Sequence, residues 1–481
     1  MKDDIEAKLK KIPTNKGLIW LKRFSADLYY NSINKPELRG IYSLPIKRGL
    51  VTYMYYIGAW NIDTVAYNLI KYSNDERNYK GSCFDYDMCY LLNNLSDNSE
   101  GLSELSETEI SLFLQGMEDD QFRYQEYYNV FNDAERIIYM FVESGLAENQ
   151  KVLLEKLIND KFACSVKDFL LALVYIFVML KHNEIESIDL NDETYFIDCG
   201  IPIDSIKKII MYYSRSYKEI RDSELGQLLL RVKPFVRNKK DLFMCPNYYS
   251  IAFIIRDALY WVIRDYYKQI KSEKFLSDFG IIFENYFYDV FEKNGLNRNI
   301  KKIPENSLYK VPDFDFRFNE YIIVFECKST MPSIGSIQQS PNICELKNYY
   351  KHIQKAYQQI QTYVQNNNLS DSKVMKVIVE FTHDKDESLL KKNFTIKDDR
   401  LFFINIAQVE TIFSLYKSNP QLFTNILAKI FDIDYLKKHY YSINNILHEN
   451  GLSSETYFKD KKNYTKYVRE KVEQLKIQKQ K

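Results

Sequence analysis

Apolar residues recur every three or four positions over most of the first 230 residues of the chain. This spacing is typical of helices that bury one face. The segments that show it are Ile19–Tyr30, Leu50–Tyr72, Thr108–Leu114, Glu135–Val142, Val152–Phe162, Val166–Lys181 and Ser205–Tyr213. Polar stretches separate them, so we predict a mostly α-helical N-terminal half.

The pattern changes near residue 232. Two short apolar segments, 233–236 and 241–245, flank the polar turn Arg237–Lys240, which predicts a small hairpin. A helix is expected next, over Ile251–Ile270. These residues would bridge the N-terminal half to the remainder of the chain.

From about residue 275 the pattern predicts an alternation of helices and strands, which indicates a layered α/β unit. A wide apolar stripe at helical spacing begins at Phe275, and Asn294-Gly295 supplies a helix end. The later elements are strands over Tyr309–Phe318 and Tyr321–Lys328, a helix over Tyr349–Val364, strands over Val374–Phe381 and Leu401–Ile406, and a helix from Val409–Tyr416.

These changes predict a multidomain chain. We expect a helical sensing, recognition or partner-docking domain over residues 1–230 and a bridging hairpin and helix over 231–270. The α/β unit would span 271–418, and a helical C-terminal segment with a basic tail would span 419–481.

Charge and composition limit the possible settings. Net charge is +1, from 66 basic and 65 acidic residues, so a nucleic-acid surface would have to be local. Residues 459–481 carry a net charge of +6 and form either a solvated helix end or a phosphate-contacting arm. Seven cysteines without a CxxC pair predict neither a disulfide framework nor a zinc site, and they fit a reducing cytoplasm. The longest apolar run, Phe169–Leu180, is shorter than the ~20 residues of a membrane span, so no membrane association is expected.

Candidate chemistry lies at the end of the Tyr321–Lys328 strand. Side chains alternate along a strand, so Glu326 and Lys328 point to the same face of a segment too apolar for a solvent edge. Asp313 begins the preceding strand, and a short antiparallel connection would bring it beside Glu326. Two carboxylates in that position suit Mg²⁺, which prefers oxygen ligands.

Several neighbours leave alternatives open. Lys328 would orient or deprotonate an attacking water. Asp315 shares a face with Asp313 and is either a second ligand or, as we favour, a partnered strand residue. Cys327 points to the opposite face, where a core position is expected, and His383-Asp384 is interpreted as a loop segment.

The residues Pro312-Asp313 and Glu326-Cys327-Lys328 resemble the PD…ExK signature of the PD-(D/E)XK nuclease superfamily, which has the restriction-endonuclease-like fold. The resemblance covers residues 275–415 and implies that 271–418 is a nuclease domain. It further implies that Mg²⁺, or Mn²⁺, is held by Asp313 and Glu326, with Lys328 as the catalytic lysine.

Two flanking features extend this resemblance. Glu284 follows Gly280 by one turn on the preceding helix, where many members of the superfamily carry a metal-binding glutamate. Gln359 and Tyr363 are similar to the QxxxY element of the RecB-like branch. The resemblance thus implies a catalytic role for Gln359 and a substrate contact for Tyr363.

The expected function is a metal-dependent DNA endonuclease in the cytoplasm, regulated through its N-terminal half by a trigger or protein partner. Family analogy favours DNA as substrate, a homodimer and a bacterial anti-phage role. The alternatives are a nucleic-acid-binding or regulatory subunit with an inactive nuclease fold, and a ribonuclease.

Overall fold

A computed structural model of the chain describes residues 2–34, 41–48, 51–76, 78–79, 81, 83–95, 106–125, 129–143, 148–181, 185–196, 200–272, 274–331, 343–370, 373–381, 391, 396–438, 443–452 and 466. His383, Asp384 and, apart from Lys466, the basic tail lie outside these residues. The expectations for them stay predictions.

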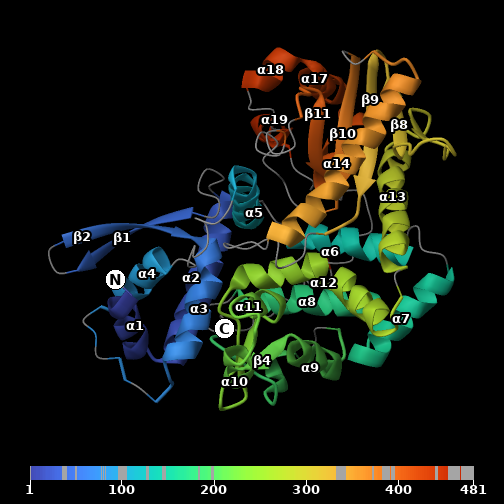
Figure 1. Ribbon diagram of the computed structural model, residues 1–481. Coiled ribbons are helices and arrows are strands. Elements are labelled where there is room, and N and C mark those ends of the chain that lie inside the picture. Colours follow the sequence, from blue (N-terminus) through green and yellow to red (C-terminus); the bar gives the residue numbers. More distant parts are fainter. Residues whose placement is uncertain are drawn as a thin grey trace.

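The chain is a mixed α/β protein in which helices dominate the first half (Figure 1). That half contains α1 (Lys2–Lys11), α2 (Thr14–Asn34), β1 (Ile41–Arg48), β2 (Val51–Gly58), α3 (Ile62–Tyr72), α4 (Phe84–Asn94), α5 (Glu107–Gln125), α6 (Val130–Ile138), α7 (Glu148–Phe162), α8 (Val166–Leu180), β3 (Ile188–Asp189), α9 (Ile203–Tyr212), β4 (Ser214–Ser216), α10 (Tyr217–Arg221) and α11 (Leu228–Val232).

The remainder begins with the hairpin and the long helix that were expected as a bridge. It contains β5 (Phe235–Arg237), β6 (Leu242–Met244), α12 (Tyr248–Gln269), α13 (Phe275–Lys293), β7 (Ile300–Lys302), β8 (Phe314–Phe318), β9 (Tyr321–Lys328), α14 (Ile343–Asn366), β10 (Val374–Glu380), β11 (Leu401–Asn405), α16 (Ile406–Ser418), α17 (Pro420–Phe431), α18 (Ile433–Lys438) and α19 (Ile443–Glu449).

One predicted helix is wrong in its first half. Residues Val51–Gly58 form strand β2, which pairs antiparallel with β1, and only Ile62–Tyr72 is the helix α3. The strand sequence VTYMYYIG is rich in β-branched and aromatic residues, which favour strands. The spacing of its apolar residues is compatible with a helix, but their identities fit a strand.

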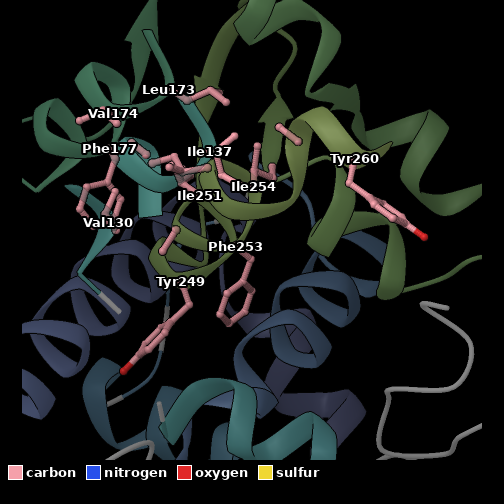
Figure 2. Close-up of a cluster of buried hydrophobic side chains, with 14 of the residues drawn as sticks. Val130, Ile137, Leu173, Val174, Phe177, Tyr249, Ile251, Phe253, Ile254 and Tyr260 are labelled. Atoms are coloured by element: carbon pink, nitrogen blue, oxygen red, sulfur yellow. The ribbon is translucent and has the colours of Figure 1, made fainter. Parts of the chain in front are cut away.

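The helical half is built around a core that α6, α8 and α12 share (Figure 2). Val130 and Ile137 of α6 pack with Phe177 of α8 and Ile251 of α12. Helix α8, which contains the longest apolar run of the sequence, is buried along most of its length, as predicted for a core helix. Within the described ranges no single helix is long and apolar enough to cross a membrane, although the bent pair Leu153–Phe162 and Val166–Lys181 passes that test on combined length and composition.

A five-stranded sheet in the order β11-β10-β9-β8-β7 forms the α/β part (Figure 1, upper right). The central position of β9 agrees with its nearly continuous apolar sequence. Helix α13 packs through Phe287 and Phe291 on the face that contains Phe325. Helix α14 covers the other face, where Val324 lies in a small core with Tyr350.

The C-terminal end of α13 lies where the sequence predicts it, and the structure shows why the helix ends there. Gly295 has a positive φ of 81°, its N–H donates to Glu292 O (3.0 Å), and the Leu296 N–H donates to Phe291 O (2.9 Å). These two bonds form a Schellman motif, which needs a residue without a side chain at the left-handed position.

Helices α5 and α6 supply two of the contacts between the N-terminal half and the α/β part. Leu112 of α5 lies in the small core beneath α14. Arg136 of α6 forms a buried ion pair with Glu410 of α16, 274 residues later in the chain. Both contacts join segments that sequence spacing cannot relate.

Candidate active site

The hairpin of β8 and β9 brings Asp313 next to the end of the central strand. The Asp313 N–H donates to Phe325 O (3.0 Å), and Asp313 Oδ2 accepts from the Cys327 N–H (2.6 Å). Asp313 stands one residue beyond the Phe314–Phe325 register pair, so it lies across from Glu326. The expected antiparallel connection between the two strands is confirmed.

Glu326 and Lys328 share the α14 face of the sheet. Val324 packs under α14, whereas Phe325 and Cys327 belong to the large core on the opposite face. Alternation along β9 therefore directs Glu326 and Lys328 toward α14, and Lys328 Nζ donates to Glu326 Oε1.

The Glu326 carboxylate is deeply buried and only half satisfied. The residue is 2% exposed, and its Oε2 atom has no hydrogen-bond partner among the described residues. A buried carboxylate oxygen without a donor is costly, typically by about 1–3 kcal/mol or more. This atom marks a place where a cation or a donor from outside the chain would be stabilised.

Glu284 approaches the same carboxylates from α13. Its Oε2 accepts from Lys302 Nζ of β7 (2.8 Å), and Lys302 is largely exposed. Burial, followed by the charges of Glu326 and Glu284, raises the pKa of the Asp313 carboxyl well above its usual range. Burial also raises the pKa of Glu326. The charge of Lys328 lowers this pKa, and the charge of Glu284 adds a smaller rise. The three carboxylates therefore repel one another in a poorly solvated setting.

Gln359 and Tyr363 both lie on α14 and contact residues 311–315, which contain Asp313 and lead into β8. Gln359 Nε2 donates to Val311 O (3.1 Å), which ties the helix to the segment leading into Asp313. The Tyr363 hydroxyl donates to Asp315 Oδ2 (3.4 Å). Gln359 thus borders the site, whereas Tyr363 is engaged farther along β8, and its substrate contact stays a prediction.

The neighbouring residues fit the structural alternatives. Asp315 is paired with Arg317, whose Nη2 donates to Asp315 Oδ2 (2.8 Å), as expected for a partnered strand residue. The Cys327 side chain is buried in the core, and burial raises the pKa of its thiol well above the usual range. A Cβ at Gly280 would meet Ser329 Oγ at 3.7 Å, an ordinary contact, so packing by the described residues does not require glycine there.

The donor set suits a hard divalent cation, although it is not arranged as a ready-made metal site. Across the part of the chain that the structure describes, no group of three or more His, Cys, Asp or Glu side chains has that arrangement. Glu326 and Glu284 are each paired with a lysine, and Asp313 accepts from a backbone N–H. Carboxylate oxygens are the ligands that Mg²⁺ and Mn²⁺ prefer, and the unpartnered Glu326 Oε2 is such a ligand.

Two residues of the site escaped the sequence interpretation. Glu380 ends β10 opposite Lys328 in the register, is buried, and accepts from the Tyr349 hydroxyl (3.0 Å). The signal available in the sequence was Glu380 itself, an acidic residue near the end of the apolar run 374–381. Lys302 offered none, because its pairing with Glu284 depends on how β7 is placed against α13.

Comparisons with known proteins do not change this description. No protein-family model matches the chain, and neither the curated proteins nor the solved structures contain a significant match.

Proposed function

We propose that the protein is a metal-dependent nuclease that hydrolyses phosphodiester bonds, with Asp313, Glu326 and Lys328 at its catalytic centre. The observation that carries the proposal is the buried, half-satisfied Glu326 carboxylate beside Asp313 and Lys328. Buried polar groups normally have hydrogen-bond partners. Asp133 also keeps a buried oxygen without a partner among the described residues, but it lies among arginines, whereas Glu326 interacts with the two further carboxylates of Asp313 and Glu284. An oxygen left over among carboxylates supports a site that is completed by a cation.

Asp313 and Glu326 would hold Mg²⁺ or Mn²⁺, with Glu284 as a further ligand once it leaves Lys302. A divalent cation supplies charge neutralisation at the scissile phosphate and lowers the pKa of water. The raised pKa values of Asp313 and Glu326 support this assignment, because burial and then carboxylate repulsion raise them and a bound cation would stabilise both ionised groups.

Lys328 supplies the chain's own positive charge at the reaction. The Lys328 side chain is partly exposed, while its partner Glu326 is buried. The Lys328 ammonium group can therefore contact substrate from its position at the end of β9. From there it would orient the attacking water and donate to a phosphoryl oxygen as negative charge develops. Gln359 would act as a positioning residue, because its bond to Val311 O holds the segment that enters Asp313.

The restriction-endonuclease-like core is part of the same proposal. Its support is the order of elements, in which α13, the β7-β8-β9 meander, α14 and the parallel strand β10 follow one another. DNA as substrate, endonuclease action, a homodimer, a cytoplasmic location and an anti-phage role rest on the resemblance alone. The N-terminal half would regulate the site through its contacts with α14 and α16.

A plasmid-cleavage assay tests the proposal. Supercoiled DNA is incubated with the protein in Mg²⁺ or Mn²⁺, with EDTA as the metal-free arm and labelled RNA as a parallel substrate. Lys328→Ala and Glu326→Gln are expected to lower cleavage at least about a hundredfold, the usual cost of removing one transition-state donor.

Lys373→Ala is the matched control, because this exposed lysine lies at the opposite end of the same sheet. It is expected to cut like the unmodified protein. Cleavage that survives EDTA, or that Lys328→Ala and Glu326→Gln retain, would refute the proposed catalytic centre. Cleavage of RNA alone would make the enzyme a ribonuclease with the same site.

A further inference from the structure

A group of basic side chains surrounds Tyr212 in the N-terminal half, far from the candidate active site. It consists of Lys161, Arg215 and Lys233, hereafter the basic cluster. Lys161 is in the last turn of α7, and Tyr212 is the last residue of α9. Arg215 is the central residue of β4, and Lys233 follows α11. In Figure 1, β4 and α9 lie at the end of the molecule opposite β8 and β9.

Both lysines lie against the same aromatic ring. Lys233 Nζ is 3.4 Å and Lys161 Nζ is 4.1 Å from the centroid of the Tyr212 ring. Lys233 Nζ also donates to Tyr212 O (2.9 Å), a carbonyl at the C-terminal end of α9. Because 3.4 Å and 4.1 Å add to 7.5 Å, the two ammonium groups lie no more than 7.5 Å apart.

Strand pairing positions Arg215, the third cation of the basic cluster. Strand β4 pairs in parallel with β5, which sets Arg215 opposite Val236, three residues after Lys233. The Arg215 guanidinium uses Nη1 to donate to Ser214 O (2.6 Å). The basic cluster is thus positioned by helix ends and a strand pair, and its members are only partly exposed.

The positive charge of the basic cluster is not balanced by ion pairs. In the described part of the chain, none of the three side chains has a carboxylate within ion-pair distance. Asp265 of α12 is the acidic residue whose charge reaches both lysines. Burial, then the charges of Arg215 and Lys161, lowers the pKa of Lys233 to about 7, and Asp265 only partly opposes this. Arg215 also interacts with the charge of Glu219 in α10, so three cations face two carboxylates and an excess of positive charge remains.

We propose that the basic cluster binds a phosphate group of a nucleotide or of a nucleic-acid strand. A guanidinium group and two ammonium groups are the donors that proteins use for phosphate oxygens, and a bound phosphate would neutralise their mutual repulsion. The structural alternative is that Lys233 only caps α9 and stacks on Tyr212. That alternative accounts for the contacts of both lysines with Tyr212, but not for the gathering of three cations with an excess of positive charge.

Binding of phosphate probes to the full chain in EDTA tests the inference without any nuclease activity. The probes are inorganic pyrophosphate, ATP and a fluorescent single-stranded DNA oligonucleotide. Lys161→Gln is the informative variant, since Lys161 makes ring contacts but no hydrogen bond to the backbone of the described residues. Loss of one charge-assisted contact is expected to weaken binding about tenfold or more.

Two companion variants keep the result interpretable. Lys161→Arg retains the charge and is expected to bind like the unmodified protein. Lys156→Gln removes an exposed lysine from the same helix, α7, and should have no effect. Circular dichroism establishes that each variant is folded.

The probe whose affinity falls identifies the ligand of the basic cluster. A tenfold loss for pyrophosphate or ATP in Lys161→Gln alone assigns a free nucleotide or phosphate ligand. The same loss for the oligonucleotide alone assigns a nucleic-acid backbone. Equal affinities in Lys161→Gln and Lys156→Gln, or no binding of any probe, would overturn it. Because Lys233 loses its proton near pH 7, with Arg215, Lys161 and Asp265 as its charged neighbours, affinity should also fall between about pH 6.5 and 8.

Discussion

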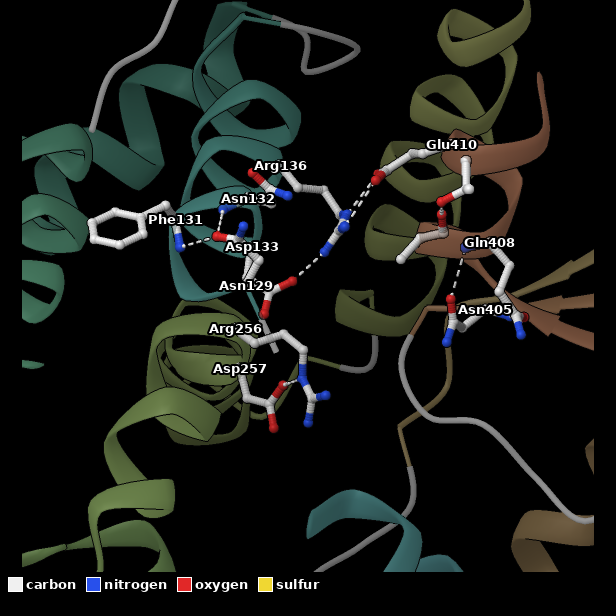
Figure 3. Close-up of polar contacts among 12 residues, drawn as sticks. Asn129, Phe131, Asn132, Asp133, Arg136, Arg256, Asp257, Asn405, Gln408 and Glu410 are labelled. Carbon is white, nitrogen blue, oxygen red and sulfur yellow. Dashed lines mark hydrogen bonds and ion pairs between the residues drawn. The ribbon is translucent and has the colours of Figure 1, made fainter. Parts of the chain in front are cut away.

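Two buried glutamates in the α/β part have opposite surroundings. Glu410 of α16 is 0% exposed, and both of its oxygens are satisfied. Arg136 donates to it from Nε (2.6 Å) and Nη2 (2.8 Å), and the Tyr286 hydroxyl donates to Oε1 (2.6 Å) (Figure 3 shows Arg136 and Glu410). Glu326 is 2% exposed; Lys328 donates to its Oε1, no group of the described residues donates to its Oε2, and Asp313 and Glu284 lie nearby.

The difference separates a structural carboxylate from a candidate functional one. Burial by itself does not distinguish them, because both side chains are almost inaccessible. The number of donors is not sufficient either, because Asp133 of α6 also has an oxygen without a partner among the described residues. The neighbouring charges do distinguish Glu326 from Glu410. Arginines act on Asp133 and Glu410, whereas the carboxylates of Asp313 and Glu284 interact with Glu326, and a bound cation would relieve that repulsion. The two residues should therefore respond in opposite ways to loss of charge.

The largest expected effect is at Glu410. Glu410→Gln removes the bidentate carboxylate partner of the buried Arg136 guanidinium and leaves it the bond to Asp133 Oδ1 (2.5 Å), so the free energy of unfolding should fall by about 3–5 kcal/mol. Chemical denaturation measures this. The triple variant Asp133→Asn/Arg136→Met/Glu410→Met should recover most of the loss, because it removes all three charges of this buried group. If the unfolding curve of Glu410→Gln overlies that of the unmodified protein, Glu410 is not the structural carboxylate that the comparison with Glu326 requires.

An intermediate effect is expected when a divalent cation reaches Glu326. Mn²⁺ at a hundred times its dissociation constant should raise the free energy of unfolding by about 2.7 kcal/mol. Glu326→Gln should abolish this gain, yet without metal it should differ from the unmodified protein by no more than about 1 kcal/mol, since it removes a repelled charge. Glu320→Gln, in the exposed turn at the other end of β9, is the control. A large metal-free loss in Glu326→Gln would make Glu326 a structural residue like Glu410.

The smallest expected effect concerns Lys302, which forms an ion pair with Glu284. Its side chain is 62% exposed, so the ion pair contributes at most about 1 kcal/mol. Lys302→Met should leave stability nearly unchanged and tighten Mn²⁺ binding about twofold to fivefold, because Glu284 is released to bind the metal. Calorimetric titration measures the affinity, with Lys301→Met as the control on the same strand. Weaker binding in Lys302→Met would instead place Lys302 among the groups that support the site.

Local patterns determined much of the α/β part. The end of α13 at Gly295, the hairpin joining β8 to β9, and the shared face of Glu326 and Lys328 all follow from residues a few positions apart. The same reasoning failed at β2, where apolar spacing was ambiguous and the tertiary pairing with β1 decided between helix and strand.

What the sequence determined by itself was therefore the character of each short segment and the side chains that one strand directs to one face, because helix and strand periodicity are local properties. Only the tertiary structure decided that Glu410 meets Arg136, that Lys302 holds Glu284, and that Lys161 and Lys233 share the Tyr212 ring. Those contacts join elements that are separated in the sequence. The packing of the whole core brings these elements together in space.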